Sequence, residues 1–205
     1  MSEPDAKEFW NARFSTEEYI FGTKPNEYLR RASKFILPSA RVLAVADGEG
    51  RNGVWLASGG HVVTSVDISS HAIEKAKRLA QKNAVNVDFQ CSDIFSWDVP
   101  QKTFDVVVCI FIQFSDEEDR KKLHDIFMKC LKPGGRLILQ GYEIGQLNYT
   151  SGGPGKAENL YTESLLREWF RDWRVLDLQV YEEVLDEGPK HQGMASLVGM
   201  VAQKI

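Results

Sequence analysis

The chain has few cysteines, and they are widely separated. Cys91, Cys109 and Cys130 form no Cys-x-x-Cys pair and lack the Cys/His spacing of a zinc site. Their odd number favours reduced thiols over a disulfide framework. We therefore expect no metal centre, and we expect two or three of these cysteines to pack in the core.

Strong net charge and long apolar runs are also absent. The chain has 25 Lys and Arg against 29 Asp and Glu, a formal charge of -4, so it has no general attraction to nucleic acid or to an anionic membrane. No apolar run approaches the length that spans a bilayer, and the N-terminal residues show no signal-peptide pattern. We expect a soluble, cytoplasmic protein, a monomer or weak homodimer, that acts on a small molecule.

Hydrophobic residues are plentiful, at 43% of 205 residues, which suffices for one well-formed core. The length requires no second domain. The sequence therefore predicts a single domain over residues 1–205.

The most informative segment is the turn at residues 47–53, which reads Asp-Gly-Glu-Gly-Arg-Asn-Gly. It follows an apolar run at residues 42–46 and precedes a helix-like pattern. Glycines allow a sharp turn from strand to helix and close approach of the backbone to a ligand. This pattern is typical of the ligand-binding turn of a Rossmann-type sheet.

The same turn matches the Gly-x-Gly-x-x-Gly pattern of dinucleotide sites, with Asp67 placed for a ribose after the next strand. A pyrophosphate, however, needs amide donors and a positive field, whereas Asp47 and Glu49 put two carboxylates into the turn. S-adenosylmethionine carries a sulfonium, an ammonium and a ribose, but no phosphate. The charge around the turn therefore favours S-adenosylmethionine over NAD.

Apolar runs and helical periodicity predict an alternation of strands and helices up to residue 142. Ser69 or Ser70 is expected to cap one helix, and a capping box at residues 115–118 to open another. The predicted strands are residues 42–46, 61–67, 87–90, 105–110 and 136–142, and the predicted helices are residues 25–37, 51–58, 70–82 and 115–131. Such an alternation predicts a parallel, doubly wound sheet.

The C-terminal third has a different order. A glycine-rich irregular stretch at residues 143–161 is long enough to be functional or mobile. Thr162 then caps a helix, and two strands, at residues 174–182 and 194–203, follow with no helix between them, which favours antiparallel pairing. The predicted fold class is α/β: a Rossmann-like, mostly parallel sheet of seven strands with a C-terminal antiparallel hairpin.

The glycine turn, the acids after the second and third strands, the LKPGGRL segment and the terminal hairpin together resemble class I S-adenosylmethionine-dependent methyltransferases. The resemblance covers nearly the whole chain. It implies cofactor contacts from the ends of the first four strands, with Asp67 on the ribose hydroxyls and Asp93 on the adenine amino group. The implied contact residues are Asp47, Gly48 and Gly50, then Asp67 and Ile68, Asp93 and Ile94, and Cys109 and Ile110.

The chain departs from that family at two positions in the first strand. Ala44 stands where the family often has an acid, and Ala46 where it often has glycine. Alanine is small enough for the turn. We expect Asp47 or Glu49 to replace the missing acid as the anchor on the ammonium side.

The flanking segments WNARFSTEEYIFGTKPNEYL and DEGPKHQG, with GEGRNGVWLA in the turn, resemble the tellurite-resistance and thiopurine S-methyltransferase group, which methylates small soft nucleophiles. This implies that residues 1–37 form a helical lid, with Trp10, Arg13, Tyr19 and Phe21 folded over the cofactor. Arg13 would pair with the cofactor carboxylate. The alternatives are a solvated arginine and aromatic side chains that only pack against the sheet.

His191 lies between the last two predicted strands, near the crevice at the carboxyl ends of the parallel strands. It is our candidate for acceptor binding or proton removal, and the alternative is a plain surface histidine. His61, His71 and His124 are expected to be inert.

These features predict a methyltransferase that acts on a small soft nucleophile, such as a thiol or a tellurium, selenium or arsenic species. A soft acceptor offers a lone pair without a strong base, so catalysis would be mainly positional. A hydroxyl acceptor would need a base, for which His191 is the candidate. The alternatives are O- or N-methylation, a non-catalytic cofactor-binding module, and an NAD-dependent oxidoreductase, which would need a catalytic domain after the fifth strand.

Overall fold

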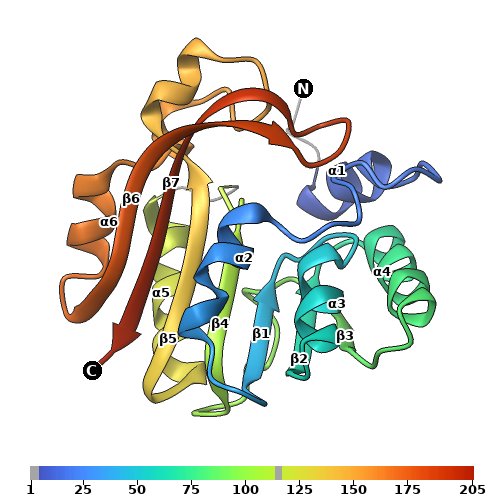
Figure 1. Cartoon of the computed structure of the whole chain (residues 1–205), viewed down its shortest axis with the longest axis horizontal. Helices are drawn as coiled ribbons and strands as arrows, with labels where there is room; N and C mark the ends of the chain where they lie inside the picture. The colour runs from blue at the N-terminus through green and yellow to red at the C-terminus, as the bar shows by residue number, and fades with distance from the viewer. Residues whose placement is uncertain (1–4, 114–116) are drawn as a thin grey trace.

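The computed structural model describes residues 5–113 and 117–205. Within them the chain forms one sheet of seven strands in the order β3-β2-β1-β4-β5-β7-β6 (Figure 1). The strands are β1 (Arg41–Val45), β2 (Val62–Asp67), β3 (Asp88–Cys91), β4 (Phe104–Ile110), β5 (Leu131–Tyr142), β6 (Trp173–Asp186) and β7 (Gln192–Lys204). The predicted α/β fold class is confirmed.

Strands β1 to β5 are parallel, and β7 is antiparallel to both β5 and β6. β1 lies between β2 and β4, so the strand order reverses there. In a doubly wound sheet the ligand crevice opens at such a reversal, outside the carboxyl ends of the strands. The predicted C-terminal hairpin is confirmed.

Helices cover both faces of the sheet because neighbouring strand residues point to opposite sides. Val42 and Val106 pack towards α2 (Glu27–Ala32) and α3 (Arg51–Ser58), whereas Leu43 and Val107 pack on the opposite face. That face is covered by α5 (Glu117–Cys130) and α6 (Glu163–Trp169), and α4 (Ser70–Lys82) lies beside α3. Cys109 and Cys130 are buried, and Cys91 is exposed.

Several predicted helix boundaries are confirmed, and two elements differ. Ser69 caps α4 through the Ala72 amide, and Thr162 caps α6 through the Leu165 amide. The helix predicted at residues 25–37 is shorter, because the Asn26 side chain caps α2 and a 3-10 turn, Ser33–Phe35, follows it. No helix connects β3 to β4, since residues 92–103 form only turns.

Ser115 and Asp116 of the predicted capping box lie outside the described residues, and α5 is described from Glu117. The segment at residues 143–161 is ordered by two 3-10 turns, Ile144–Asn148 and Ala157–Asn159. The buried Gln146 side chain ties it to Ser151 and to the Ser196 amide. None of the described helices is long and apolar enough to cross a membrane.

The N-terminal helix α1 (Ala6–Arg13) lies over the end of the sheet towards which β1 points (Figure 1). The β6–β7 hairpin bends over the same end, and its loop touches the segment that follows α1. There the Lys190 amide donates to the Ile20 carbonyl, and Gly188 packs directly on Gly22. The first and last segments of the described chain therefore meet above the carboxyl ends of the strands.

Candidate functional site

The glycine turn leaves β1 in a left-handed backbone conformation. Ala46, Gly48 and Gly50 all have positive φ, and Gly50 ends the turn as the N-cap of α3. A Cβ at Gly50 would lie 2.6 Å from the Cβ of Ala76, so the contact between the turn and α4 requires glycine there. The Phe14 ring lies over Gly48. The turn is thus held between α4 and the segment after α1.

Two buried aspartates stabilise the turn through hydrogen bonds. Asp47 accepts hydrogen bonds from the Gly53 amide at 3.0 Å and the Ser65 hydroxyl at 3.2 Å, and burial raises its pKa to about 7. Asp67, at the end of β2, accepts from the Gly48 amide at 2.8 Å and the Ser69 amide at 2.9 Å. Burial raises the pKa of Asp67 to about 6. Asp67 therefore fixes the turn of β1 to the end of β2.

The geometry of Asp67 fits a ribose. Its Oδ1 accepts a hydrogen bond from the Ser69 amide, and its Oδ2 accepts one from the Gly48 amide. A carboxylate offers about four acceptor positions, two on each oxygen. One acceptor position on each oxygen therefore has no hydrogen-bond partner among the described residues.

The Glu49 carboxylate is buried and paired, so it does not add negative charge to the turn as the sequence suggested. It forms an ion pair with Lys75, and both side chains are only 2% exposed. Glu49 also accepts from the Ile20 and Phe21 amides. Its charge is thus neutralised inside the protein, so the expectation that Glu49 replaces the acid missing at position 44 is wrong.

Asp93, Ile94, Ile68, Cys109 and Ile110 all lie at the same end of the sheet, at or just after the ends of β2, β3 and β4. The Asp93 carboxylate accepts from the Phe95 amide at 3.0 Å and is half-buried. Ile94 and Cys109 are buried, and burial raises the pKa of the Cys109 thiol. These residues remain candidates for cofactor contact.

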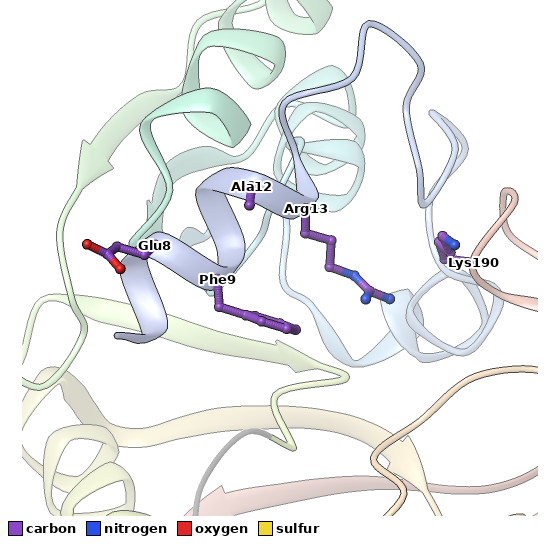
Figure 2. A pocket seen from close by; sticks show the side chains of 5 residues that line it. All are labelled: Glu8, Phe9, Ala12, Arg13 and Lys190. Atoms are coloured by element: carbon purple, nitrogen blue, oxygen red, sulfur yellow. The ribbon is translucent and has the colours of Figure 1, made fainter. Parts of the chain in front are cut away.

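Aromatic rings join α1 to the glycine turn. Trp10 stacks on Phe14 with ring centroids 5.6 Å apart, and Phe14 meets Phe21 edge-on at 6.0 Å. The Arg13 guanidinium carbon lies 5.8 Å from the ring centroids of both Trp10 and Phe21. Beside them opens a shallow cavity of about 590 Å³, lined by Glu8, Phe9, Ala12, Arg13 and Lys190 (Figure 2).

Tyr19 is not brought into this group. Its hydroxyl donates to the Lys75 carbonyl at 2.9 Å, and its ring packs against Val54 and Leu79. These contacts tie the N-terminal segment to α3 and α4. The structure thus gives Tyr19 a packing role.

His191 is buried at 7% exposure, so it is not the surface histidine of the alternative interpretation. Its ring lies 4.5 Å from those of Phe21 and Phe111 and meets the Tyr142 ring at right angles, at 5.8 Å. Burial lowers the pKa of His191 below its usual value, so the imidazole is neutral at pH 7. Its Nδ1 lies 4.0 Å from Glu187 Oε2, too far for a hydrogen bond.

Sequence reasoning missed Arg51 and Glu187. Arg51 donates from Nη2 to Glu187 Oε2 at 2.7 Å, and the two side chains are 7% and 9% exposed. Glu187 also accepts from Asn26 Nδ2 and the Glu27 amide. A basic residue directly after the glycine turn was the available signal for Arg51, whereas only the folded hairpin brings Glu187 to it.

Comparison with known proteins agrees with this geometry. Residues 42–135 match the family model described as "Methyltransferase domain". This region, just under half of the chain, is similar to class I, S-adenosylmethionine-dependent methyltransferase domains. S-adenosylmethionine is the cofactor of this domain family, and the ribose positions left open on Asp67 fit it.

Two curated relatives of the methyltransferase domain differ in the acceptor atom named for them. A ubiquinone biosynthesis O-methyltransferase of Coxiella burnetii is 27% identical over 134 residues, 65% of this chain and 56% of the relative. The probable thiol methyltransferase 2 of Arabidopsis thaliana is 34% identical over 121 residues, 58% of this chain and 52% of the relative. The chain spans about half the length of these curated relatives.

The methyltransferase fold extends beyond the matched residues. A solved structure concerned with the conversion of a disulfide bond into a thioacetal group during echinomycin biosynthesis superposes with a TM-score of 0.81. It covers 98% of this chain and 92% of its own, at 15% sequence identity. At this identity the likeness concerns the fold alone.

Proposed function

We propose that this protein transfers the sulfonium methyl group of S-adenosylmethionine to a small molecule with a soft nucleophile, a thiol foremost, or a selenium, tellurium or arsenic species. The observation that carries the proposal is Asp67, with one acceptor position left on each oxygen beside the glycine turn. The thiol is supported by the Arabidopsis relative, which is 34% identical in the matched region.

On the donor side, we assign the ribose to Asp67, the adenine amino group to Asp93 and the methionine moiety to the turn. Ile68, Ile94, Cys109 and Ile110 border the same groove. Trp10 and Arg13 cover it from α1, where Arg13 is placed to hold the cofactor carboxylate through parallel hydrogen bonds. Tyr19 is left out of the cofactor site because α4 already holds its hydroxyl.

When bound, S-adenosylmethionine supplies an electrophilic methyl group. Transfer would join the methyl carbon to the acceptor sulfur and would leave the electron pair of the broken bond on the sulfonium sulfur, with S-adenosylhomocysteine as the second product. The protein holds the two atoms in line and excludes water with the rings of Trp10, Phe14, Phe21 and Phe111. Neutral His191 lies beside these rings and can hold the proton that a thiol releases.

A second candidate function is O-methylation of a hydroxyl acceptor, which one observation favours. Burial keeps His191 neutral at pH 7 and therefore able to accept a proton. The Coxiella relative is named as an O-methyltransferase. Phenols therefore belong in the test beside thiols.

We further propose that residues 1–205 act as one domain and that the movable lid is α1 alone, not all of residues 1–37. α1 has no buried residue. The segment after it is held by several buried contacts: Lys75 donates to the Thr16 and Glu18 carbonyls, and Glu49 accepts from the Ile20 and Phe21 amides. α1 itself is hydrogen-bonded to α4 and its N-cap through one residue, Asn11, whose side chain accepts from the Ser69 hydroxyl at 2.8 Å and whose carbonyl lies 2.9 Å from His71 Nδ1.

A methyl-transfer screen with labelled S-adenosylmethionine against thiols, phenols and oxyanions tests the function, with calorimetry of S-adenosylhomocysteine alongside. Transfer to thiols, with phenols at least tenfold poorer, is the expected result. Transfer to phenols alone would select the second candidate. Binding of the cofactor without transfer to any acceptor would leave a non-catalytic binding module, and thermal stabilisation by NADH alone would overturn the proposal.

A further inference from the structure

Three buried polar atoms without a partner gather next to the glycine turn. They are Nη1 of Arg51, Oη of Tyr142 and Nδ1 of His191, and their residues are 6%, 2% and 7% exposed. A buried donor left unpaired costs about 1–3 kcal/mol, so proteins rarely leave one without a reason. Three together indicate a place where a ligand supplies the missing partner.

These atoms border one space. Glu187 Oε2 takes the other Arg51 nitrogen at 2.7 Å and lies 4.0 Å from His191 Nδ1. The Tyr142 and His191 rings stand at right angles, 5.8 Å apart. A Cβ at Gly152 would lie 2.6 Å from Tyr142 Oη and 3.4 Å from His191 Cδ2, so the backbone of this glycine packs closely beside both side chains and a larger residue would not fit there.

The chemistry of the cluster favours an anion. Arg51 Nη1 and Tyr142 Oη are donors, and neutral His191 donates from one ring nitrogen. Glu187 is ionised and balances the charge of Arg51, because the neighbouring His191 and Arg51 side chains and the Glu27 amide hold its pKa at about 2 in spite of burial. Further positive charge comes from Arg13, which lowers the pKa of His191 together with burial and Arg51.

The approach to the cluster is also basic. The cavity beside α1 is lined by Arg13 and Lys190, with Glu8 as its one acidic residue (Figure 2). Figure 2 shows Arg13 extending from the end of α1 towards the side where Lys190 lies. Lys190 directly precedes His191 in the hairpin loop, and Phe21 lies between Arg13 and His191, 5.8 Å from the Arg13 guanidinium carbon and 4.5 Å from the His191 ring.

We propose that Arg51, Tyr142 and His191 bind a carboxylate of the acceptor, so that the preferred acceptor is an anionic thiol. This inference rests on the proposed function, because it assigns the cluster to the acceptor side of that site. A carboxylate also occurs on the methionine moiety of the cofactor, which we assign to Arg13. The test therefore separates the two sources.

The test compares two thiols with and without the charge: 3-mercaptopropionate against 3-mercaptopropanamide, and 2-mercaptobenzoate against 2-mercaptobenzamide. Binding of each to the S-adenosylhomocysteine complex is measured by calorimetry, and methyl transfer is measured separately. We expect at least one acid to bind ten times more tightly than its amide. Equal binding of acid and amide in both pairs, or no binding of any of the four, would overturn the inference.

Tyr142→Phe removes one unpartnered hydroxyl and keeps the ring, and Tyr161→Phe is the matched control. Tyr161 is also fully buried with an unpartnered hydroxyl, but it packs in the core under α6. Tyr142→Phe should weaken the acid three- to tenfold, leave the amide and S-adenosylhomocysteine unchanged, and differ from the control. Weaker S-adenosylhomocysteine binding with an unchanged acid preference would place the cofactor carboxylate at the cluster and overturn the inference.

The two failures are distinguishable. If the acid binds tightly but neither member of a pair is methylated, the thiol acceptor fails and the anion site stands. If both members are methylated with equal KM, the proposed function stands and the anion site fails.

Discussion

We call Asp47 and Asp67 the donor side, after the methyl donor, and Arg51, Tyr142 and His191 the acceptor side, after the methyl acceptor. The two sides differ in whether their buried polar atoms have hydrogen-bond partners within the protein. On the donor side, Asp47 and Asp67 are bonded to backbone amides and a serine hydroxyl. On the acceptor side, Arg51, Tyr142 and His191 each keep one buried atom without a partner. Both donor-side carboxylates thus have hydrogen-bond partners within the protein, whereas each of the three acceptor-side residues keeps one buried polar atom with no protein partner.

The two sides also come from different parts of the chain. The glycine turn and both aspartates lie inside the matched residues 42–135, whereas Tyr142, Glu187 and His191 lie after them. Arg51 is the exception, since it lies inside the matched residues, directly after the glycine turn, and pairs with Glu187. The two sets therefore differ mostly in their place in the chain, and predictions can test each set separately.

The largest effect is expected from Lys75→Met, which leaves the Glu49 charge buried and unpaired beneath the donor side. Removing one partner of a buried ion pair costs about 3–5 kcal/mol of unfolding free energy. Urea unfolding measures it. Lys122→Met on α5, where the pairs with Glu118 and Asp119 are exposed, is the control and should leave stability unchanged. Equal stability of the two variants would show that the framework does not depend on the pair.

Asp67→Ala should weaken S-adenosylmethionine binding by roughly 2–4 kcal/mol, because two ribose hydroxyls lose a charged acceptor. Calorimetry measures the change, with the exposed Asp88→Ala on β3 as the control. Unchanged affinity in Asp67→Ala would remove this residue from the donor side.

The raised pKa of Asp67, about 6, gives the donor side a pH dependence. The ribose hydroxyls donate best to the ionised carboxylate of Asp67. The affinity for S-adenosylhomocysteine should therefore rise as pH increases from 5 to 7, by up to about tenfold per pH unit below the pKa. Asp67→Asn should flatten this rise. A pH-independent affinity in the wild type would contradict the assignment.

The raised pKa values of Asp47 and Asp67 also affect stability. Acid usually lowers the free energy of unfolding, but these two carboxyl groups contribute in the opposite direction. Between about pH 4 and 7 the native protein holds protons on Asp47 and Asp67 that the unfolded chain has released. Their contribution therefore stabilises the ligand-free protein at low pH and is lost as pH rises through about 6 to 7. Urea unfolding across this range, compared with the Asp47→Asn and Asp67→Asn double variant, measures it.

On the acceptor side, His191→Ala should change cofactor affinity less than twofold while turnover falls. If His191 acts as a base for a hydroxyl, the wild-type rate should rise through a pKa below 6.5, since burial lowers it, and the variant should lose that limb. If it only binds the acceptor, KM rises and kcat stays. Unchanged kcat and KM for every substrate would leave it a packing residue.

The smallest effect concerns the lid, by hydrogen exchange with and without S-adenosylhomocysteine. Residues 6–13 should gain protection with ligand, whereas the amides of Ile20 and Phe21 should be protected in both states because Glu49 accepts from them. Ligand-dependent exchange at Ile20 and Phe21 would extend the lid back to the broader segment expected from the sequence.

Periodicity and turn chemistry were sufficient to predict the fold, because each rule is local. Buried strands read as apolar runs, Ser69 and Thr162 cap helices, and the glycines mark the turn. The donor-side candidates Asp67 and Asp93 followed for the same reason, since parallel strands end at one edge. Their placement at that edge was predictable, and their ligand contacts remain predictions.

The acceptor side and the charge balance were not predictable from local patterns. Lys75 lies in the middle of α4, and nothing nearby in the sequence shows that it faces Glu49. Arg51 and Glu187 are 136 residues apart, and only the bend of the hairpin pairs them. Contacts of this kind depend on tertiary packing, for which periodicity carries no signal.

The Glu49–Lys75 pair also determines where an expression fragment of this protein can start. The matched region begins at residue 42, yet both charges of the pair are covered by the segment from Thr16 to Phe21. An expression fragment trimmed to the matched region would expose the pair and uncover the α4 surface that Tyr19 seals. Fragments and fusions of this chain should therefore start before Phe14 to keep the pair covered, and before α1 to keep the proposed cofactor contacts of Trp10 and Arg13.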